Sequence, residues 1–355
     1  MDLLSPPTNY IGTALFFSYI LAALVLTARV LLHLHTLHFE HLSHDTSPAA
    51  AARFATLATC AVVLFATLSY HMLSFLLASY TSFCEARGLL LLPATAASVS
   101  GQLWIWMLAS TLFSDFARDL VVGGTAASRA WAQTALVWSL GVSVFIGVEG
   151  KRRWRTGAWG AEAGEVVALA QVLPVSFALV LWLMGDVGGD APADAGQGAT
   201  SQESKDVAGS KGAGEERGAD AKEEGVEVGA AVPAAVGVYV AVLPVLSRAA
   251  EESMTKLIGA VFLLRACLAV PYLASRPAVK GSAQGQVASL TQNLTCGIGI
   301  AGGLVQLGLV WSRAVKESDG WVEIVEGLWE TPAVGAMSMD AVFGAFSVVA
   351  FALVE

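Results

Sequence analysis

Long apolar stretches separated by short polar segments dominate the pattern along this 355-residue chain. About 20 consecutive apolar residues can cross a bilayer as an α-helix, and eight stretches have roughly that length. They predict an all-α fold, a polytopic transmembrane helix bundle of about eight spans. The predicted spans are 11–34, 53–79, 131–149, 164–184, 232–248, 257–274, 291–312 and 336–354.

Residues 101–122 form a ninth helical stretch, which is less apolar because it contains Asp115, Arg118 and Asp119. This stretch is either a polar span or a helix that lies at the membrane surface or re-enters it. The sequence leaves these alternatives open.

Lysine and arginine predict the orientation, because the side richer in them faces the cytosol. With eight spans, nine of these residues fall on one side and five in the short loops opposite, so both termini would face the lumen or exterior. The two groups are Arg53, Lys151, Arg152, Arg153, Arg155, Arg248, Lys256, Arg313 and Lys316 against Arg87, Arg118, Arg129, Arg276 and Lys280. A crossing by 101–122 would invert part of this count.

Composition agrees with a membrane protein. Hydrophobic residues make up 55% of the chain and charged residues 14%, whereas soluble domains have about 25% charged residues. The N-terminus, MDLLSPPTNY, has no basic segment of the kind that opens a signal peptide, so the first stretch is interpreted as a retained helix. The four cysteines form no CxxC pair, which argues against a disulfide framework or a thiolate metal site.

An acidic, glycine- and alanine-rich segment divides the chain into three parts. These are an N-terminal transmembrane half (1–184), a linker (185–231) and a C-terminal transmembrane half (232–355). Between Gly185 and Gly229 there are 11 acidic and 4 basic residues, so −7 of the net charge of −9 lies here. Such a segment cannot bury enough apolar surface to fold, and we expect a disordered tether.

Ionisable residues concentrate in the apolar N-terminal half. An Asp or Arg at membrane depth costs at least about 2.5–3.5 kcal/mol, so several such groups indicate a use. They are His71, Glu85, Asp115, Arg118, Asp119 and Glu149. The C-terminal half offers only Arg265 and Asp340, together with a glycine-rich helix that suits close packing.

Two carboxylates are the main candidates for chemistry. Asp115, Arg118 and Asp119 share one face of a helix, where they can form a local ion pair or present an acid to a cavity. Glu149 ends the third span, before the basic residues 151–153. It is either an interfacial residue paired with them or a second, shielded carboxylate.

Polar and aromatic side chains in the same half can bind a ligand or simply pack. Amides inside apolar spans need hydrogen-bond partners, and the kink at Pro174 can border a cavity. The candidates for substrate binding are His71, Trp106, Phe116, Arg118, Gln133, Trp138 and Gln171. The five histidines from His33 to His44 alternate faces without a completing ligand set, so we expect no metal site.

Four sequence runs in this half resemble fungal multi-pass membrane proteins that include terpene cyclases of meroterpenoid (ascochlorin-type) secondary metabolism. They are SYHMLSFLLASYTSF, WIWMLASTLFSDFARDL, AWAQTALVWSLGVSVFIGVEGKRR and QVLPVSFALVLW, within Ser69–Trp182. The resemblance implies an enzyme of isomerase or lyase type, expected in the endoplasmic reticulum. It would cyclise a lipophilic prenylated aromatic substrate whose chain carries an epoxide, without a metal or other cofactor.

In that scheme Asp115 protonates the epoxide with support from Arg118, and Glu149 is its acid partner or the final base. His71, Gln133 and Gln171 would orient the substrate oxygens, while Trp106, Phe116 and Trp138 would line the cavity.

The main alternative is a transporter or carrier of a small organic molecule, without catalytic activity, in which the same polar residues line a path. A third hypothesis is a structural membrane protein that holds a partner through the acidic linker. The sequence contains no nucleotide-binding loop, hydrolase motif or nucleic-acid patch, so ATP-driven transport, hydrolysis and nucleic-acid binding are not expected.

Overall fold

The structure, a computed structural model, describes residues 9–42, 48–91, 96–153, 162–189, 226–227, 231–274, 276–277, 301 and 303–354. Most of this part is helical. The helices are α1 Tyr10–Leu42, α2 Pro48–Arg87, α3 Ala96–Ala109, α4 Leu112–Val121, α5 Ala126–Arg153, α6 Glu162–Val172, α7 Val175–Gly189, α8 Ala231–Glu252, α9 Met254–Ala274, α11 Trp321–Glu326 and α12 Pro332–Val354. Residues 303–317 are also helical, and the two-residue strands β1 Val226–Glu227 and β2 Arg276–Pro277 pair antiparallel.

Five helices are long and apolar enough to cross a membrane, which indicates a membrane protein. Their membrane-length segments are Gly12–His38, Pro48–Arg87, Ala126–Gly150, Thr255–Ala274 and Pro332–Ala352. Large apolar side chains such as Leu21, Leu24 and Val62 point outward and are 63–69% exposed. An apolar outer surface is favourable in contact with lipid and unfavourable in contact with water.

The stretch 164–184, predicted as one span, is instead a helical hairpin. α6 ends before Pro174, and α7 returns beside it, with the two helices in contact. A Cβ on Gly150 of α5 would lie 3.4 Å from Trp182 and 3.6 Å from Ala163, so the start of α6 and the late part of α7 share one level. Proline lacks an amide hydrogen and disfavours helix at the residue before it, which explains the turn.

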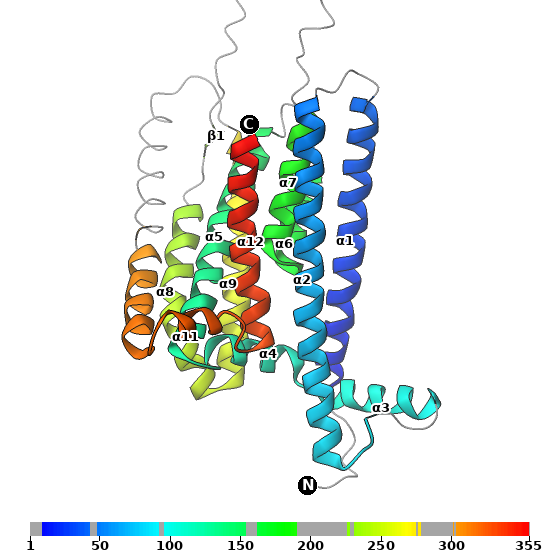
Figure 1. Ribbon diagram of the computed structural model, residues 1–355, viewed down its shortest axis with the longest axis vertical. Helices are drawn as coiled ribbons and strands as arrows, with labels where there is room; N and C mark the ends of the chain where they lie inside the picture. The colour runs from blue at the N-terminus through cyan, green and yellow to red at the C-terminus, as the bar shows by residue number, and fades with distance from the viewer. Residues whose placement is uncertain are drawn as a thin grey trace, which may run out of the picture.

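The hairpin enters and leaves at the upper end of the bundle (Figure 1). All residues from 175 to 185 are buried, because α7 packs against α1, α2, α5, α6 and α12. A helix that is hydrophobic on all sides is stable only when neighbours surround it, as they do here.

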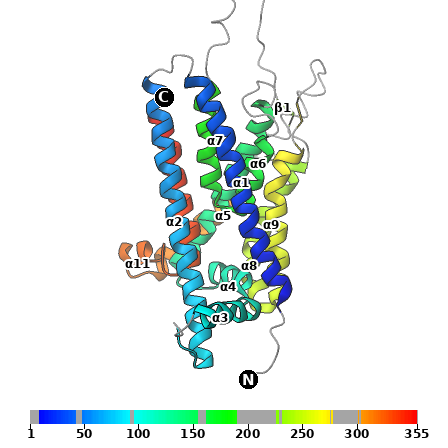
Figure 2. The same ribbon diagram turned by 90° about the vertical axis from the view of Figure 1, so that its right-hand side faces the viewer.

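Residues 101–122 do not cross as one helix, because the chain breaks at Ser110 and Thr111 between α3 and α4. α3 lies across the long axis at the lower end (Figure 1), and Figure 2 shows α4 at the same end. α4 contacts α1, α2, α5, α8, α9 and α12, so it closes the lower end of the bundle.

Three other predicted segments agree only in part with the structure. The span 232–248 falls in α8, whose apolar stretch, Ala231–Leu246, is shorter than the five membrane-length helices. For 291–312, the described residues begin at 301. The predicted disordered linker lies mostly outside the described residues, but its first residues, 185–189, belong to α7.

The hairpin also changes the predicted orientation. Because the hairpin returns to the upper end, the α8–α9 junction with Arg248 and Lys256 lies at the lower end, whereas α2, with Arg53, begins at the upper end (Figure 1). These basic residues therefore lie on opposite sides, and the nine-to-five count no longer orients the chain.

Cysteine labelling tests the hairpin. In a background with Cys60, Cys84, Cys267 and Cys296 changed to alanine, we expect a cysteine at Val187 to react with a membrane-impermeant maleimide from the same side as one at Ala49. A cysteine at Thr111 should react from the opposite side of sealed vesicles. Labelling of the Val187 and Thr111 positions from the same side would mean that 164–184 crosses the membrane.

Candidate functional site

A buried polar centre lies at the tip of the hairpin, where α5, α7 and α12 meet. The backbone amide of Ser176 donates to the two carboxylate oxygens of Asp340, at 3.2 and 3.4 Å. The Ser176 hydroxyl donates to the Asp340 carbonyl at 2.7 Å, and Trp138 Nε1 donates to that hydroxyl at 2.8 Å. Three helices are thus joined by side chains that are far apart in the sequence.

The break at Pro174 explains why the centre forms. The first amides of a helix have no acceptor within it, and a carboxylate at this end is favoured by the helix dipole. Asp340 supplies the acceptor for the start of α7 and is 4% exposed. No ion pair of Asp340 occurs within 4.0 Å among the described residues, so these amides are the nearest groups that balance its charge, and Arg265 acts from a greater distance.

The centre lies near the middle of the bundle. Trp138 is the central residue of the apolar segment Ala126–Gly150. Since Trp138 bonds Ser176 directly, the hairpin reaches about half the depth of the segment that α5 offers to a membrane. A carboxyl group at that depth is costly, and such groups usually serve a function.

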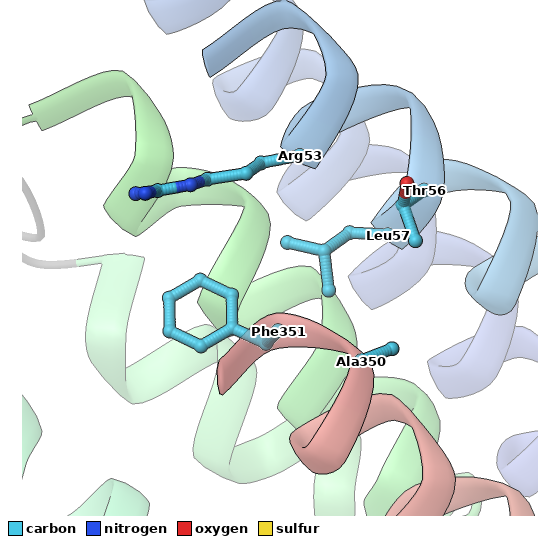
Figure 3. Close-up of a pocket in the computed structure, with 5 residues that line it drawn as sticks. All are labelled: Arg53, Thr56, Leu57, Ala350 and Phe351. Atoms are coloured by element: carbon cyan, nitrogen blue, oxygen red, sulfur yellow. The ribbon is translucent and has the colours of Figure 1, made fainter. Parts of the chain in front are cut away.

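A small cavity adjoins the carboxyl group. It is a narrow space of about 10 Å³, roughly room for one water molecule, between α2, α12 and the hairpin tip. Its lining is mostly apolar, with Asp340 as the ionisable group, and consists of Leu64, Thr67, Leu68, Pro174, Ala336, Met339, Asp340 and Phe343. A second small hollow, too narrow for a water molecule, lies between α2 and α12 near Arg53, Leu57 and Phe351 (Figure 3), away from the polar centre.

Two glycines of α12 make room for side chains around the cavity. A Cβ on Gly335 would lie 2.6 Å from the imidazole of His71, so this predicted ligand residue packs directly on α12. A Cβ on Gly344 would collide with the Ser176 hydroxyl and lie 2.9 Å from Trp138 Nε1. Alanine at either position would therefore force these side chains to move.

Three predicted residues lie around the hairpin tip. Trp138 contacts Ser176 directly, and His71 stands one turn from the cavity residues Thr67 and Leu68. Gln171 ends α6 just before the turn, and its amide oxygen and nitrogen are both buried without a hydrogen-bond partner. Of these three, Trp138 belongs to the polar centre of Asp340, while His71 and Gln171 lie near the hairpin tip.

The predicted acid Asp115 lies elsewhere. It is in the first turn of α4 at the lower end, where it accepts a hydrogen bond of 2.8 Å from Thr111. No ion pair joins Asp115 and Arg118 within 4.0 Å, and Arg118 is exposed. Glu149 lies in the last turns of α5, at the upper end, so the two candidate carboxylates do not face one cavity.

The remaining predicted residues pack between helices. Trp106 is buried, donates to Ser79 at 3.3 Å and meets Tyr80 edge to face. Phe116 packs edge to face on Phe75. Gln133 accepts a hydrogen bond of 3.2 Å from Gln306, which is the interhelical role that its sequence context allowed.

Ser176 and Asp340 are the residues that sequence reasoning did not select. Asp340 is an ionisable residue within an apolar run, MSMDAVFGAF, and the same kind of signal singled out Asp115. Its partner lies 164 residues away, so no local spacing could reveal the pair. In the described part of the chain, no group of three or more His, Cys, Asp or Glu side chains could hold a metal ion.

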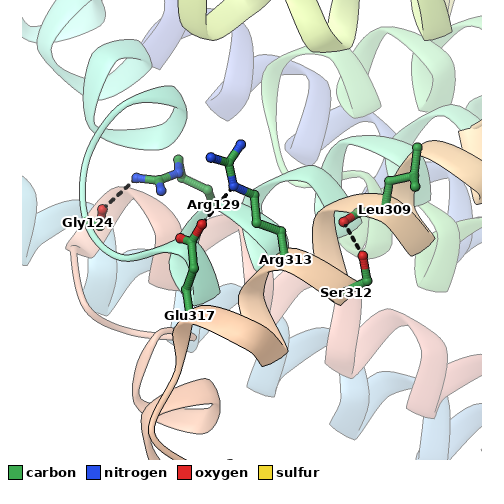
Figure 4. Close-up of polar contacts among 6 residues, drawn as sticks. All are labelled: Gly124, Arg129, Leu309, Ser312, Arg313 and Glu317. Carbon is green, nitrogen blue, oxygen red and sulfur yellow. Dashed lines mark hydrogen bonds and ion pairs between the residues drawn. The ribbon is translucent and has the colours of Figure 1, made fainter.

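Polar contacts gather at the lower end, away from the hairpin. Arg129 donates to the carbonyl of Gly124 at 2.9 Å, and Arg313 pairs with Glu317 at 2.8 Å, as Figure 4 shows. The Glu330 carboxylate accepts from the Thr125 amide and hydroxyl, at 2.9 and 2.8 Å, and so caps α5. These contacts suit an interface between membrane and water.

No family model, curated protein or solved structure matches this chain. The resemblance of 69–182 to fungal meroterpenoid cyclases therefore stays a prediction, and function has to be argued from the site.

Close packing around Ser176 can be tested with alanine at Gly344. The added methyl group must displace the Ser176 hydroxyl or the Trp138 indole, so we expect a loss of about 1–3 kcal/mol in stability. Gly259→Ala is the control, since nothing lies within 4 Å of its Cβ position. Alanine there should be neutral or stabilise the helix by up to about 1 kcal/mol. Thermal unfolding in detergent, followed by a thiol-reactive dye, measures both, and equal effects would contradict the geometry.

The electrostatics of α4 give a pH-dependent prediction. Burial raises the pKa of Asp119 above its ordinary value of 3.8, and repulsion from Asp115 adds to the rise while Arg118 opposes it. The protonated form is thus favoured in the folded state, and this stabilisation is lost as pH rises through the folded pKa. Asp119→Asn should raise Tm by a few degrees at pH 7.5 and have less effect at pH 4.5. The exposed control Asp319→Asn should show no such trend, and a pH-independent effect of Asp119→Asn would refute the assignment.

Proposed function

We propose that this protein is a polytopic carrier of a small organic solute and that Asp340 takes up and releases a proton as the solute crosses. One observation supports this above all: Asp340 binds the start of a half-length helix in the middle of the bundle. Of the two activities predicted from the sequence, this is the alternative to the cyclase. Location in the endoplasmic reticulum and seven crossings beside the hairpin are part of the proposal.

Half-length helices favour a carrier for a physical reason. Their ends leave backbone amides and carbonyls unpaired at membrane depth, where transporters use them to bind substrates and ions. A buried carboxylate that forms no direct ion pair can be neutralised by a proton, so a proton can accompany a solute that binds beside it. The cavity that Asp340 lines marks where such a solute would bind once the surrounding helices move apart.

Cavity size argues against a large substrate. Sites for organic ligands usually measure about 300–1,000 Å³, whereas the cavity beside Asp340 has a volume of about 10 Å³, roughly room for one water molecule, so it must widen before any organic solute binds. A prenylated aromatic molecule with a farnesyl-length chain needs a much larger enclosure. The separation of Asp115 from Glu149 also leaves the acid–base scheme of the cyclase without a shared cavity.

The cyclase is kept as a second candidate because aromatic rings accompany the carboxyl group. Phe343 lines the cavity with Asp340, and Trp138 donates a hydrogen bond to Ser176, which in turn binds Asp340. A protonated Asp340 could then act as the acid in place of Asp115, with these rings stabilising a cation. The cavity would have to widen before an epoxyprenyl phenol could enter.

Proteoliposomes that enclose a pH-sensitive dye test the carrier. We expect one or more of a panel of small organic acids, amines and amino acids to drive proton movement with wild-type protein. Asp340→Asn should reduce this movement at least tenfold, because an amide cannot carry the proton, and Asp340→Glu should keep part of it. Glu251→Gln, an exposed carboxyl-to-amide change at the end of α8, is the matched control and should stay within twofold of wild type.

The same purified protein should be incubated in detergent with an epoxyfarnesyl phenol. The carrier proposal expects no product. An isomer of equal mass and shifted retention, formed by wild type and lost in Asp340→Asn, would replace the carrier with the cyclase. Proton movement no greater than in empty liposomes across the whole panel would also reject the carrier.

A further inference from the structure

We propose that Arg265, Gln171 and Ser143 form a binding site for the carboxylate group of a small organic acid, on the α9 side of the hairpin. This inference rests on the proposed carrier function and names the class of its solute. It starts from Arg265, which lies at the centre of the membrane-length segment Thr255–Ala274. In the described part of the chain, Arg265 forms no ion pair within 4.0 Å.

An arginine at that depth without a counter-ion is unfavourable, and such residues normally pair or mark a path for a charged ligand. Arg265 is half-buried and lies within electrostatic range of Asp340 on α12, Tyr239 on α8 and Tyr19 on α1, so it is surrounded by several helices. Asp340 is occupied by the start of α7, and a direct bond to Arg265 is not formed. The N–H groups of the Arg265 guanidinium are therefore available to bind another anion.

Helix geometry brings Gln171 to Arg265. Gly164 of α6 faces Tyr272 of α9, since its Cβ position lies 3.0 Å from the Tyr272 hydroxyl. The two helices are antiparallel neighbours, and Gln171 and Arg265 each lie seven residues from this contact in the same direction. Seven residues are about two turns and about 10 Å, so we infer that Gln171 lies on the side of α6 toward α9, within reach of the long Arg265 side chain.

Ser143 joins them from α5. A Cβ on Gly147 would lie 2.7 Å from the backbone nitrogen of Tyr272, so this side of α5 faces α9. Ser143 is one turn before Gly147 on the same face, and it is buried. Its hydroxyl has no hydrogen-bond partner, and the same is true of both amide atoms of Gln171.

Donors of this kind fit a carboxylate. The guanidinium offers two parallel N–H groups to the two oxygens of one carboxylate, and the serine hydroxyl and the glutamine amide add single donors. Buried donors normally have acceptors, so an unpaired set in the interior indicates the ligand that would satisfy them.

Charge balance links this site with Asp340. Without solute, the positive Arg265 and a negative Asp340 sum to zero. With a bound carboxylate and a proton on Asp340, the sum is again zero. The site therefore carries no net charge with or without the solute. It can open alternately to the two sides of the membrane in either state without moving a net charge through the membrane interior.

Ligand-dependent thermal stability tests the site without a transport assay. In detergent, sodium acetate, benzoate or succinate should raise the Tm of wild type by several degrees relative to sodium chloride at equal ionic strength. Arg265→Gln should abolish this shift while keeping or raising the Tm without ligand, because it removes an unpaired charge. Gln171→Leu should weaken the shift, and Arg248→Gln, at the exposed lower end, should leave it unchanged.

The inference fails if none of these carboxylates shifts wild type, or if the shift survives in Arg265→Gln. Its failure is separable from that of the carrier. Proton movement driven only by amines or neutral solutes would keep the carrier and reject the carboxylate site. Carboxylate stabilisation lost in Arg265→Gln, without any proton movement, would keep the site and reject the carrier.

Discussion

The hydrogen bonds from Ser176 to Asp340 are the contacts on which the rest of the arrangement depends. Pro174 ends α6 in the interior, and the amides that begin α7 must then find an acceptor away from water. Asp340 meets that need from α12. Because α7 can start at this depth, it returns to the side from which α6 came. Every later helix therefore runs in the opposite direction to the one it would have if residues 164–184 crossed the membrane once.

This arrangement leaves a surplus of polar groups that packing alone does not explain. A hairpin tip could be stabilised by a neutral acceptor, without the cost of a buried carboxyl group. The same region keeps Arg265 at mid-depth and Gln171 and Ser143 without partners. Such groups persist when a ligand, a proton or water completes them, so their joint presence around one hairpin is the strongest reason to place function there.

Hydropathy predicted the five membrane-length helices because the criterion is local: each is a continuous apolar run. It could not tell a crossing from a hairpin over 164–184. Both halves of that stretch are apolar and their summed length suits one span, so only Pro174 indicated the turn. For the site, apolar context drew attention to Trp138, Gln171 and His71, which do lie near the tip. Asp115 was chosen from i, i+3 and i+4 spacing, which describes the face of a helix but not its depth.

The two ends of the bundle are closed in different ways, which bears on how a solute would reach Asp340. Above the polar centre stands α7, buried along 175–185 and packed on five helices. Below it lies α4, a ten-residue helix with Leu112 and Ser114 as its buried residues and with Asp115 and Arg118 on its surface. Segments with little buried apolar surface open at lower free energy than those at the centre of a core. Movement of α4 therefore costs less than removal of the hairpin, and access to the cavity from the lower side should be the easier of the two.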